Sequence, residues 1–458
     1  MSQVDTPIDA YIARHEDQFL EDLKGWLRIP SISTIPEHVS DIRQAAEYAV
    51  GQLRAAGLER AEVLPTTGHP LVYGEWLKAP GKPTLLIYGH YDVQPVDPIE
   101  LWTHPPFEPT VQNGNLYCRG ASDDKGQAML CIKALESLMQ VNGTLPLNVR
   151  VLFEGEEEAG GESIEHYVKT YPERLSCDAV FICDTHMPSK EIPTLIYGLR
   201  GITYAEIEVQ GARRDLHSGS YGGVAPNPLH SLAVIISRLK DADGHIHIPG
   251  LYEQLRRPTT DEKTFWQEDP LHIGTALLEE MGVSQFSGEQ EYPPLERIWA
   301  RPTLEVHGIA GGFVGEGAKT VIPAAAKAKV SLRLPPPLKS SEAFALLERA
   351  VQEYAPAGVT VRVHNLHGGE GALVSPESKP MQAASAALKE VYGREPVLMR
   401  EGGSIPIAAL FDEMLHAPIV LMGFGLPDDN LHAPNEKYAL DQFFNGMRTV
   451  TRFLQKLA

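Results

Sequence analysis

Short apolar segments alternate with helical segments along most of this chain, and this alternation is the feature that most limits its fold. Runs with the length and apolar character of buried strands are found at residues 83–89, 147–153, 179–183 and 418–422. Helical periodicity is found around them at residues 126–139, from about residue 163, and at 438–457. Apolar strands separated by helices predict an α/β fold with a mostly parallel sheet flanked by helices.

The N-terminal segment is also expected to be helical. Thr6 and Pro7 suit the cap and the first turn of a helix, and apolar residues recur at helical spacing over residues 8–27. A second helix should run from about Asp41 to near Gly57, because glycine often ends helices.

The middle of the chain has a different order of elements. We expect strands at residues 204–209, 303–306, 327–334 and 359–363. The expected helices are residues 228–239, with Asn227 as the N-cap, and residues 342–354. This β-α-β-β-α-β order predicts a smaller ferredoxin-like α+β domain, with residues 241–301 inserted into it.

The length of the chain allows more than one domain. A chain of 458 residues is too long for one compact core, and roughly two or three domains are expected. We predict that residues 200–375 form the smaller domain and interrupt a catalytic α/β domain made of residues 1–199 and 376–458.

The acidic composition argues against some classes of partner. The chain has 40 basic and 60 acidic side chains, which give a formal net charge of −20. Non-specific binding to nucleic acid or to an anionic membrane would need a basic surface, so we expect neither partner. No apolar run reaches the roughly 18 residues that a membrane helix needs.

The cysteines and the N-terminus indicate a cytoplasmic location. The chain has no C-x-x-C pair, and its four cysteines are Cys118, Cys131, Cys177 and Cys183. Free thiols in a reducing compartment are the simplest interpretation. The polar and acidic first 20 residues do not have the pattern of a signal peptide.

Acidic and imidazole side chains follow the predicted strands, at the edge where α/β sheets bind ligands. His90 and Asp92 are two residues apart, so on an extended chain they face the same way. Asp92 could then accept a hydrogen bond from one ring nitrogen of His90 while the other nitrogen binds a metal. Taken alone, His90 is better interpreted as a solvated loop histidine, since the chain has 17 histidines.

Two further acidic clusters have competing interpretations. Asp123 and Asp124 come directly before a predicted helix, where they could bind a metal or cap the helix. Residues 154–158 contain four glutamates, and acidic runs usually lie on solvated faces. This run ends a buried strand, however, where mutual repulsion calls for a counter-charge such as a metal ion.

Asp184 and His432 complete the set, because each follows a predicted strand. Histidines and carboxylates without a thiolate suit zinc, with manganese or cobalt as alternatives. If a carboxylate bridges them, two ions about 3.5–4 Å apart could share one water and stabilise a tetrahedral intermediate.

Several sequence motifs resemble one known family, the di-metal aminoacylases and carboxypeptidases, and above all its carnosine-type and cytosolic nonspecific dipeptidases. The resemblance extends from about residue 8 to the C-terminus. The motifs that carry it are Gly89-His-Tyr-Asp-Val-Gln-Pro95, Gly120-Ala-Ser-Asp-Asp-Lys-Gly126, the glutamates of residues 154–158, Lys319-Thr-Val-Ile-Pro323, Arg400-Glu-Gly-Gly-Ser-Ile-Pro406 and Asn435-Glu-Lys437.

The resemblance implies a role for each residue of a two-metal site. His90 and Asp184 would bind one ion, Glu158 and His432 the other, and Asp123 would bridge them, with a cis peptide bond after it. Asp92 would orient His90. Glu157 would be the general base, although the run of glutamates leaves Glu156 and Glu157 as an alternative working pair.

The resemblance also implies roles for residues of the interrupting domain, which would be a lid and dimerisation domain. His217 would reach into the site of the partner subunit of a homodimer and stabilise the oxyanion. Arg333 and Thr320 would hold the substrate carboxylate, and Ser404 lies in the matching Gly-Gly-Ser loop. Without the resemblance, His217 is a surface histidine and Arg333 a polar residue on an alternating strand.

These inferences predict a metal-dependent dipeptidase that acts on small peptides with a free C-terminal carboxylate. An N-acyl-amino-acid deacylase or a carboxypeptidase of the same family would use the same metals and base, and only substrate screening separates the three. A catalytically inactive binding protein on the same fold is a further alternative. Loss of ligands would mark such a protein, and every expected ligand is present.

Overall fold

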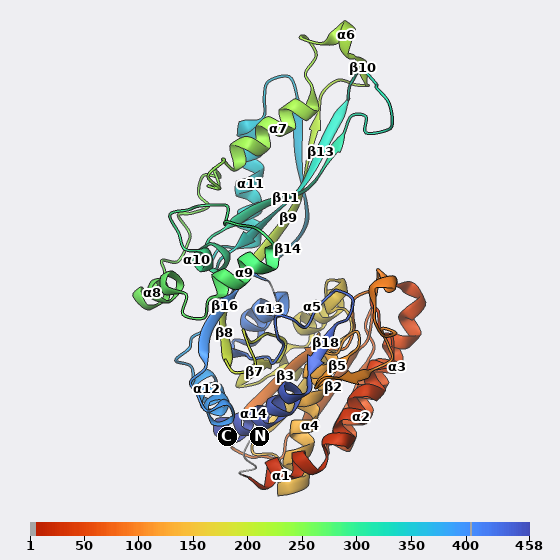
Figure 1. Ribbon diagram of the computed structural model, residues 1–458, viewed down its shortest axis with the longest axis vertical. Helices are drawn as coiled ribbons and strands as arrows, with labels where there is room; N and C mark the ends of the chain where they lie inside the picture. Colours follow the sequence, from red (N-terminus) through yellow and green to blue (C-terminus); the bar gives the residue numbers. More distant parts are fainter. Residues whose placement is uncertain (1–5, 404) are drawn as a thin grey trace. The chain divides into compact units, whose positions relative to one another are not determined.

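The computed structural model describes residues 6–403 and 405–458, which form two compact units (Figure 1). The larger unit contains the described residues up to Tyr197, together with Val374–Met399 and Leu410–Ala458. The smaller unit contains Gly198–Leu373 and the described part of Arg400–Ala409. The chain therefore leaves the larger unit twice and returns to it twice. Three of the four divisions fall within the strands β8 (Thr194–Leu199) and β16 (Val397–Glu401) and the helix α13 (Pro406–Leu415), and the fourth directly follows β15 (Ala372–Leu373).

A mixed sheet is the centre of the larger unit. Its strand order is β1-β2-β6-β3-β7-β17-β8-β15, with β16 also paired to β8. Besides β8 and β16, its strands are β1 (Arg60–Leu64), β2 (Leu71–Trp76), β3 (Thr84–His90), β6 (Asn148–Glu154), β7 (Ala179–Ile182) and β17 (Ile419–Leu421), and the strand order ends in β15 (Ala372–Leu373), whose residues are assigned to the smaller unit. The four central strands β6, β3, β7 and β17 are parallel, and the pairs toward both edges are antiparallel.

The predicted α/β class is confirmed, with more antiparallel pairing at the edges than the sequence indicated. The physical reason is the length of the connections. Only a short loop joins β1 to β2, and such a loop returns the chain in the opposite direction, whereas a parallel pair needs a long crossover. The crossover from β3 to β6 contains α4 (Lys125–Asn142), which is buried along most of its length.

Helices flank this sheet. They are α1 (Pro7–Arg14), α2 (Glu16–Leu27), α3 (Val39–Ala55), α4, α5 (Glu162–Thr170), α12 (Lys379–Tyr392) and α14 (Leu440–Leu457). The expected N-terminal helix is interrupted at His15, although Thr6 caps it as predicted and forms a capping box with Asp9. The closing helix begins at Leu440, because β18 (Lys437–Ala439) pairs with β5 (Asn115–Tyr117), which also pairs with β4 (Thr110–Gln112).

The smaller unit has the ferredoxin-like topology expected from the sequence. Its antiparallel sheet has the order β11-β13-β9-β14 and consists of β11 (Thr303–Gly311), β13 (Ala325–Leu334), β9 (Gly201–Gln210) and β14 (Thr360–Gly369). Two helices, α7 (Pro228–Leu239), capped by Asn227, and α11 (Ser340–Tyr354), pack on one face. Ile207, Leu232 and Leu347 are among the apolar side chains buried there.

The insertion in the smaller unit is helical. It contains α8 (Thr260–Glu268), α9 (Ile273–Met281) and α10 (Pro294–Trp299), and Trp266 of α8 packs edge-on against Trp299 of α10. At one end of the four-stranded sheet lie the short helix α6 (Ser218–Tyr221) and the strand pair of β10 (Leu216–His217) with β12 (Val321–Ile322) (Figure 1). In the described residues, no helix is both long enough and apolar enough to cross a membrane.

Candidate metal centre

The parallel strands of the larger unit bring the predicted ligands to one edge of the sheet. His90 is the last residue of β3 and pairs with Glu154, the last residue of β6. On the other side of β3, Tyr88 pairs with Ile182, and Asp184 follows two residues later. Because the carboxyl ends of parallel strands meet at the same edge, side chains distant in sequence become neighbours there.

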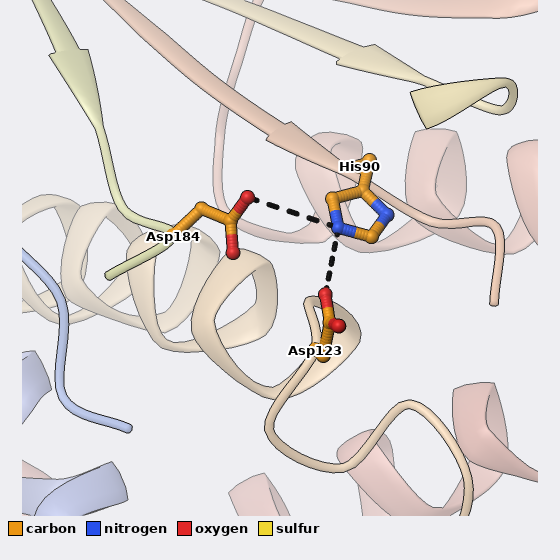
Figure 2. Close-up of side chains that lie close together, drawn as sticks. All are labelled: His90, Asp123 and Asp184. Atoms are coloured by element: carbon orange, nitrogen blue, oxygen red, sulfur yellow. Dashed lines mark hydrogen bonds and ion pairs between the residues drawn. The ribbon is translucent and has the colours of Figure 1, made fainter. Parts of the chain in front are cut away.

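His90, Asp123 and Asp184 form the first cluster (Figure 2). The Nε2 atom of His90 lies 3.0 Å from Oδ1 of Asp123 and 3.9 Å from Oδ2 of Asp184. One possible ligand atom from each of the three residues lies within 4.8 Å of the others. His90 is buried, and the two carboxylates are partly exposed, so the cluster can be reached by a small ion.

Asp123, Glu158 and His432 form the second cluster. The Nε2 atom of His432 lies 3.0 Å from Oδ2 of Asp123 and 3.2 Å from Oε1 of Glu158. Asp123 thus belongs to both clusters and turns a different oxygen to each histidine. Its peptide bond to Asp124 is cis, as the resemblance implied.

Asp92 connects the histidine ligand to the glutamate turn. Its carbonyl oxygen and its Oδ1 atom lie 3.1 Å and 3.3 Å from Nδ1 of His90, so Nε2 is the nitrogen that faces the cluster. The two carboxylate oxygens of Asp92 accept the backbone N–H groups of Glu157 at 3.2 Å and Glu158 at 3.0 Å. One buried carboxylate therefore holds both the ring of His90 and the turn that carries the predicted base.

The three consecutive glutamates have different surroundings. The carboxylate of Glu156 belongs to neither cluster and accepts the backbone N–H groups of His69 at 2.5 Å and Ser163 at 3.0 Å. Glu158 accepts a hydrogen bond from Nε2 of Gln94 at 2.6 Å and faces His432. Burial raises the pKa of Glu157 well above its usual value, which favours a carboxyl group that can take up a proton.

The charge of the site fits cations. Burial raises the pKa of Asp184 to about 6, against the opposing effect of His90, and hydrogen bonds to Asp123 and Glu158 raise the pKa of His432 to about 10. Closely spaced carboxylates that are largely shielded from water require positive counter-charge. Two clusters of oxygen and nitrogen donors that share one aspartate are a donor set that suits two divalent ions.

The predicted residues of the interrupting domain lie in the smaller unit. His217 pairs with Val321 across β10 and β12, and the adjacent Ser218 donates its N–H to the carbonyl of Thr320 at 3.0 Å, so His217 and Thr320 are neighbours. Both side chains are exposed. Arg333 lies near the opposite end of β13 and pairs with Ile202. Ser404 lies outside the described residues.

With this geometry established, comparison with known proteins identifies the family. Residues 86–456 match the model of peptidase family M20/M25/M40. The chain belongs to this family. The predicted resemblance is thereby confirmed, and so is the expected enzyme class, a metallopeptidase.

Individual known proteins match almost the whole chain. The Cys-Gly metallodipeptidase dug1 of Schizosaccharomyces pombe is 33% identical over 470 residues, which cover 98% of this chain and 97% of the relative. The crystal structure of human carnosine dipeptidase 1 matches with a TM-score of 0.82 at 30% identity and covers 98% of both chains. The metallo-carboxypeptidase Sso-CP2 from Sulfolobus solfataricus gives a TM-score of 0.86 at 33% identity, with 96% of this chain and 99% of that chain covered.

Two residues of this M20 peptidase contribute to the site in ways that were not inferred from the sequence. Asp124 is the N-cap of α4 by position, but its side chain does not cap the helix and instead accepts the backbone N–H of His90 at 3.0 Å. Gln94 donates to Glu158. Both residues belong to the motifs that carry the family resemblance, but those motifs do not indicate which groups they bind.

Proposed function

We propose that this peptidase hydrolyses the amide bond of dipeptides, or of similarly small peptides, that carry a free C-terminal carboxylate. The observation that carries the proposal is the position of Asp123, which is shared by two clusters of ligand atoms. In this assignment His90 and Asp184 hold one divalent ion, Glu158 and His432 hold the other, and Asp123 bridges them. Zinc is the proposed metal, with manganese or cobalt as alternatives.

Glu157 is the proposed general base. Divalent ions in this position would lower the pKa of a water molecule and polarise the scissile carbonyl. The carboxylate of Glu157 would accept the proton from water and deliver it to the leaving amine. Its raised pKa suits a group that holds a proton for part of the cycle, and the backbone hydrogen bond to Asp92 fixes its position. Glu156 is a poor candidate because two backbone N–H groups already occupy its carboxylate.

Arg333 is the proposed anchor for the substrate carboxylate, together with Thr320 and Ser404. A guanidinium presents a planar set of donors that matches a carboxylate in a bidentate pair. The side chain of Arg333 faces away from Leu332 and Leu334, which are buried in the core of the smaller unit, and remains partly exposed. It can therefore meet a ligand without disturbing that core.

The geometry of the smaller unit favours active sites shared between two subunits. Asp215 accepts the N–H of Ala324, which places His217 near the start of β13. From Ala325 to Arg333 this strand advances by roughly 27 Å, at about 3.4 Å per residue. An extended dipeptide spans only about 7 Å. A single small substrate cannot contact Arg333 and His217 of the same chain, so we propose a homodimer in which His217 and Thr320 serve the partner's site.

Two related activities are alternatives to dipeptide hydrolysis. A carboxypeptidase is supported by the match to Sso-CP2, and an N-acyl-amino-acid deacylase would use the same metals and base. A further alternative is an inactive binding protein, which would have the same fold but would not hydrolyse peptides.

A cytoplasmic location remains a prediction.

Metal analysis combined with a substrate panel tests the proposal. The purified protein should contain two divalent ions per chain and should hydrolyse dipeptides faster than N-acyl-amino acids or longer peptides. Asp123→Ala should lose both metal and activity, whereas Asp17→Ala, at an exposed carboxylate of α2, should retain them. Rapid release of C-terminal residues from long peptides would favour the carboxypeptidase. Absence of both bound metal and hydrolysis, after incubation with zinc and manganese, would refute the proposal.

A further inference from the structure

Glu436 is a buried carboxylate outside the set of expected metal ligands, and it accepts four hydrogen bonds. Its Oε2 atom accepts Nη1 of Arg119 at 2.8 Å and the backbone N–H of Gly120 at 2.9 Å. Its Oε1 atom accepts the backbone N–H groups of Ser122 at 3.0 Å and Asp123 at 3.2 Å. The side chain thus holds the backbone of the segment that ends in the proposed bridging ligand.

Arg119 balances the buried charge of Glu436 and is itself fixed in place. It donates to the carbonyl oxygen of Pro95 at 3.0 Å, and its guanidinium lies 5.3 Å from the ring centre of Trp102. Both Arg119 and Glu436 are only 1% exposed at the side chain. Burying a charged pair is unfavourable unless the pair is hydrogen-bonded, and here both partners are.

Glu436 also belongs to the loop that carries His432. Three non-glycine residues of this loop, Asn430, His432 and Asn435, have positive φ angles, so its backbone follows an unusual path. The side chain of Asn435 accepts the N–H of Thr103 at 2.7 Å and donates to the carbonyl of Leu101 at 2.9 Å. The loop is therefore attached at Asn435 to one neighbouring segment and at Glu436 to the segment of Asp123.

Asp429 of the same loop also binds the segment that contains Asp123. The Oδ2 atom of Asp429 accepts the hydroxyl of Ser122 at 2.7 Å and the backbone N–H of Leu426 at 2.8 Å. Residues 429 and 436 therefore hold residues 120–123 from both sides of His432. Asp123 and His432 are 309 residues apart in the sequence, yet their segments are joined by side-chain hydrogen bonds on both sides of the ligand pair.

We infer that Glu436 is a positioning residue that sets the separation of Asp123 and His432, and through it the affinity of the site for its second metal ion. This inference rests on the proposed function. A carboxylate can accept from all four donors at once, whereas the amide of glutamine has only one acceptor oxygen. In Glu436→Gln the NH₂ group must face two N–H donors, either those of Arg119 and Gly120 or those of Ser122 and Asp123. The backbone beside Asp123 is expected to shift in response.

The test is a titration of metal-depleted full-length protein with Zn²⁺ alone, followed by calorimetry, in parallel with dipeptide hydrolysis. Substitution of groups that orient metal ligands typically weakens binding or activity about 10–100-fold, and we expect a loss of this size for Glu436→Gln. Excess Zn²⁺ should restore much of kcat, and KM for the dipeptide should change little. Glu436→Asp, which retains the charge but is shorter, should show a smaller loss in the same direction and gives a second measurement if the glutamine variant folds poorly.

Asp9→Asn is the matched control for a purely structural effect. Asp9 is another fully buried carboxylate of the larger unit and pairs with Arg452. This variant should lower the thermal midpoint while leaving Zn²⁺ affinity and kcat unchanged. Zn²⁺ affinity and kcat of Glu436→Gln equal to those of the wild type would overturn the inference. If the wild type binds no Zn²⁺ and hydrolyses no dipeptide, the proposed function itself is wrong, and the two failures are thus distinguishable.

Discussion

The carboxylate of Asp92 accepts the backbone N–H of Glu157 at 3.2 Å. Asp92 also lies beside Nδ1 of His90, so the residue that orients a proposed ligand holds the backbone of the proposed base. A shift of this carboxylate would move ligand and base together. The first prediction concerns that base.

Glu157→Gln should retain the fold and both metal ions but lose most of its turnover. Glutamine has nearly the same shape but cannot accept the proton from water, and a positioned acid–base group contributes about 10²–10⁴-fold to rate. The loss should be seen in kcat for a dipeptide, with metal content measured on the same sample.

Glu156→Gln is the matched control for Glu157→Gln. It replaces a carboxylate that binds the N–H groups of His69 and Ser163, so it should lower the free energy of unfolding by about 1–3 kcal/mol while much of the activity remains. Near-normal turnover in Glu157→Gln, with an inactive Glu156→Gln, would show that the neighbouring glutamate is the base.

Mixed dimers should recover activity that each parent lacks. His217→Ala and Asp123→Ala are both expected to be inactive as homodimers. After subunit exchange, a heterodimer has one site with an intact Asp123 and with His217 supplied by the other chain. Partial recovery of dipeptide hydrolysis is the expected result. If exchange is verified by mass and no activity returns, the active sites are not shared in this way.

Amidation of the substrate's C-terminus should greatly reduce kcat/KM. Arg333 is the proposed partner of the carboxylate, and loss of a charge-assisted hydrogen bond of about 1.5–3 kcal/mol corresponds to roughly a 10–150-fold decrease. Arg333→Lys should also be impaired, because an ammonium group cannot reproduce the planar fork. Equal rates for the amide and the free acid would exclude Arg333 as the anchor.

Asp9→Asn should destabilise the larger unit. Asp9 accepts two hydrogen bonds from Arg452 at 3.0 Å and 2.8 Å, and both residues are buried. Arg452 keeps its ion pair with Glu390 in this variant, so the expected cost is that of the lost charge-assisted hydrogen bonds, about 1.5–3 kcal/mol. The exposed pair of Glu21 and Lys24 supplies the control: Glu21→Gln should change stability by less than about 1 kcal/mol. Urea denaturation measures the free energy of unfolding of both variants.

The effect of Asp9→Asn should also depend on pH. Burial by itself raises the pKa of Asp9, but hydrogen bonds from Arg452 and Thr6 outweigh it, so the pKa in the folded state is lowered. The stabilisation of the folded state by the charged carboxylate is therefore fully present above the pKa of Asp9 in the unfolded chain, about 3.9. It is lost as the pH falls through the lower pKa of Asp9 in the folded state. The stability difference from the wild type should shrink below about pH 4. A constant difference down to pH 2 would contradict this account.

The sequence alone predicted the main elements of both units, because their signals are local. The spacing of Phe19, Leu23 and Trp26 indicates a helix before any contact is known, and the apolar run at 179–183 indicates a buried strand. It also placed His90 and Asp184 after strands, and hence at the binding edge of a parallel sheet. These inferences need only periodicity, residue type and the rule that parallel strands share an edge.

Other features depended on contacts that no local pattern contains. The family resemblance, and no local pattern, implied that Asp123 lies between His90 and His432. Only the folded chain showed that Glu156 accepts backbone N–H groups and that the sheet edges are antiparallel. His432 and Asp123 are 309 residues apart, and their separation depends on the packing and hydrogen bonding of every segment between them. The sequence therefore determined which side chains could bind a metal, and the tertiary structure decided which of them meet, because distance between remote segments is a property of the whole packed chain.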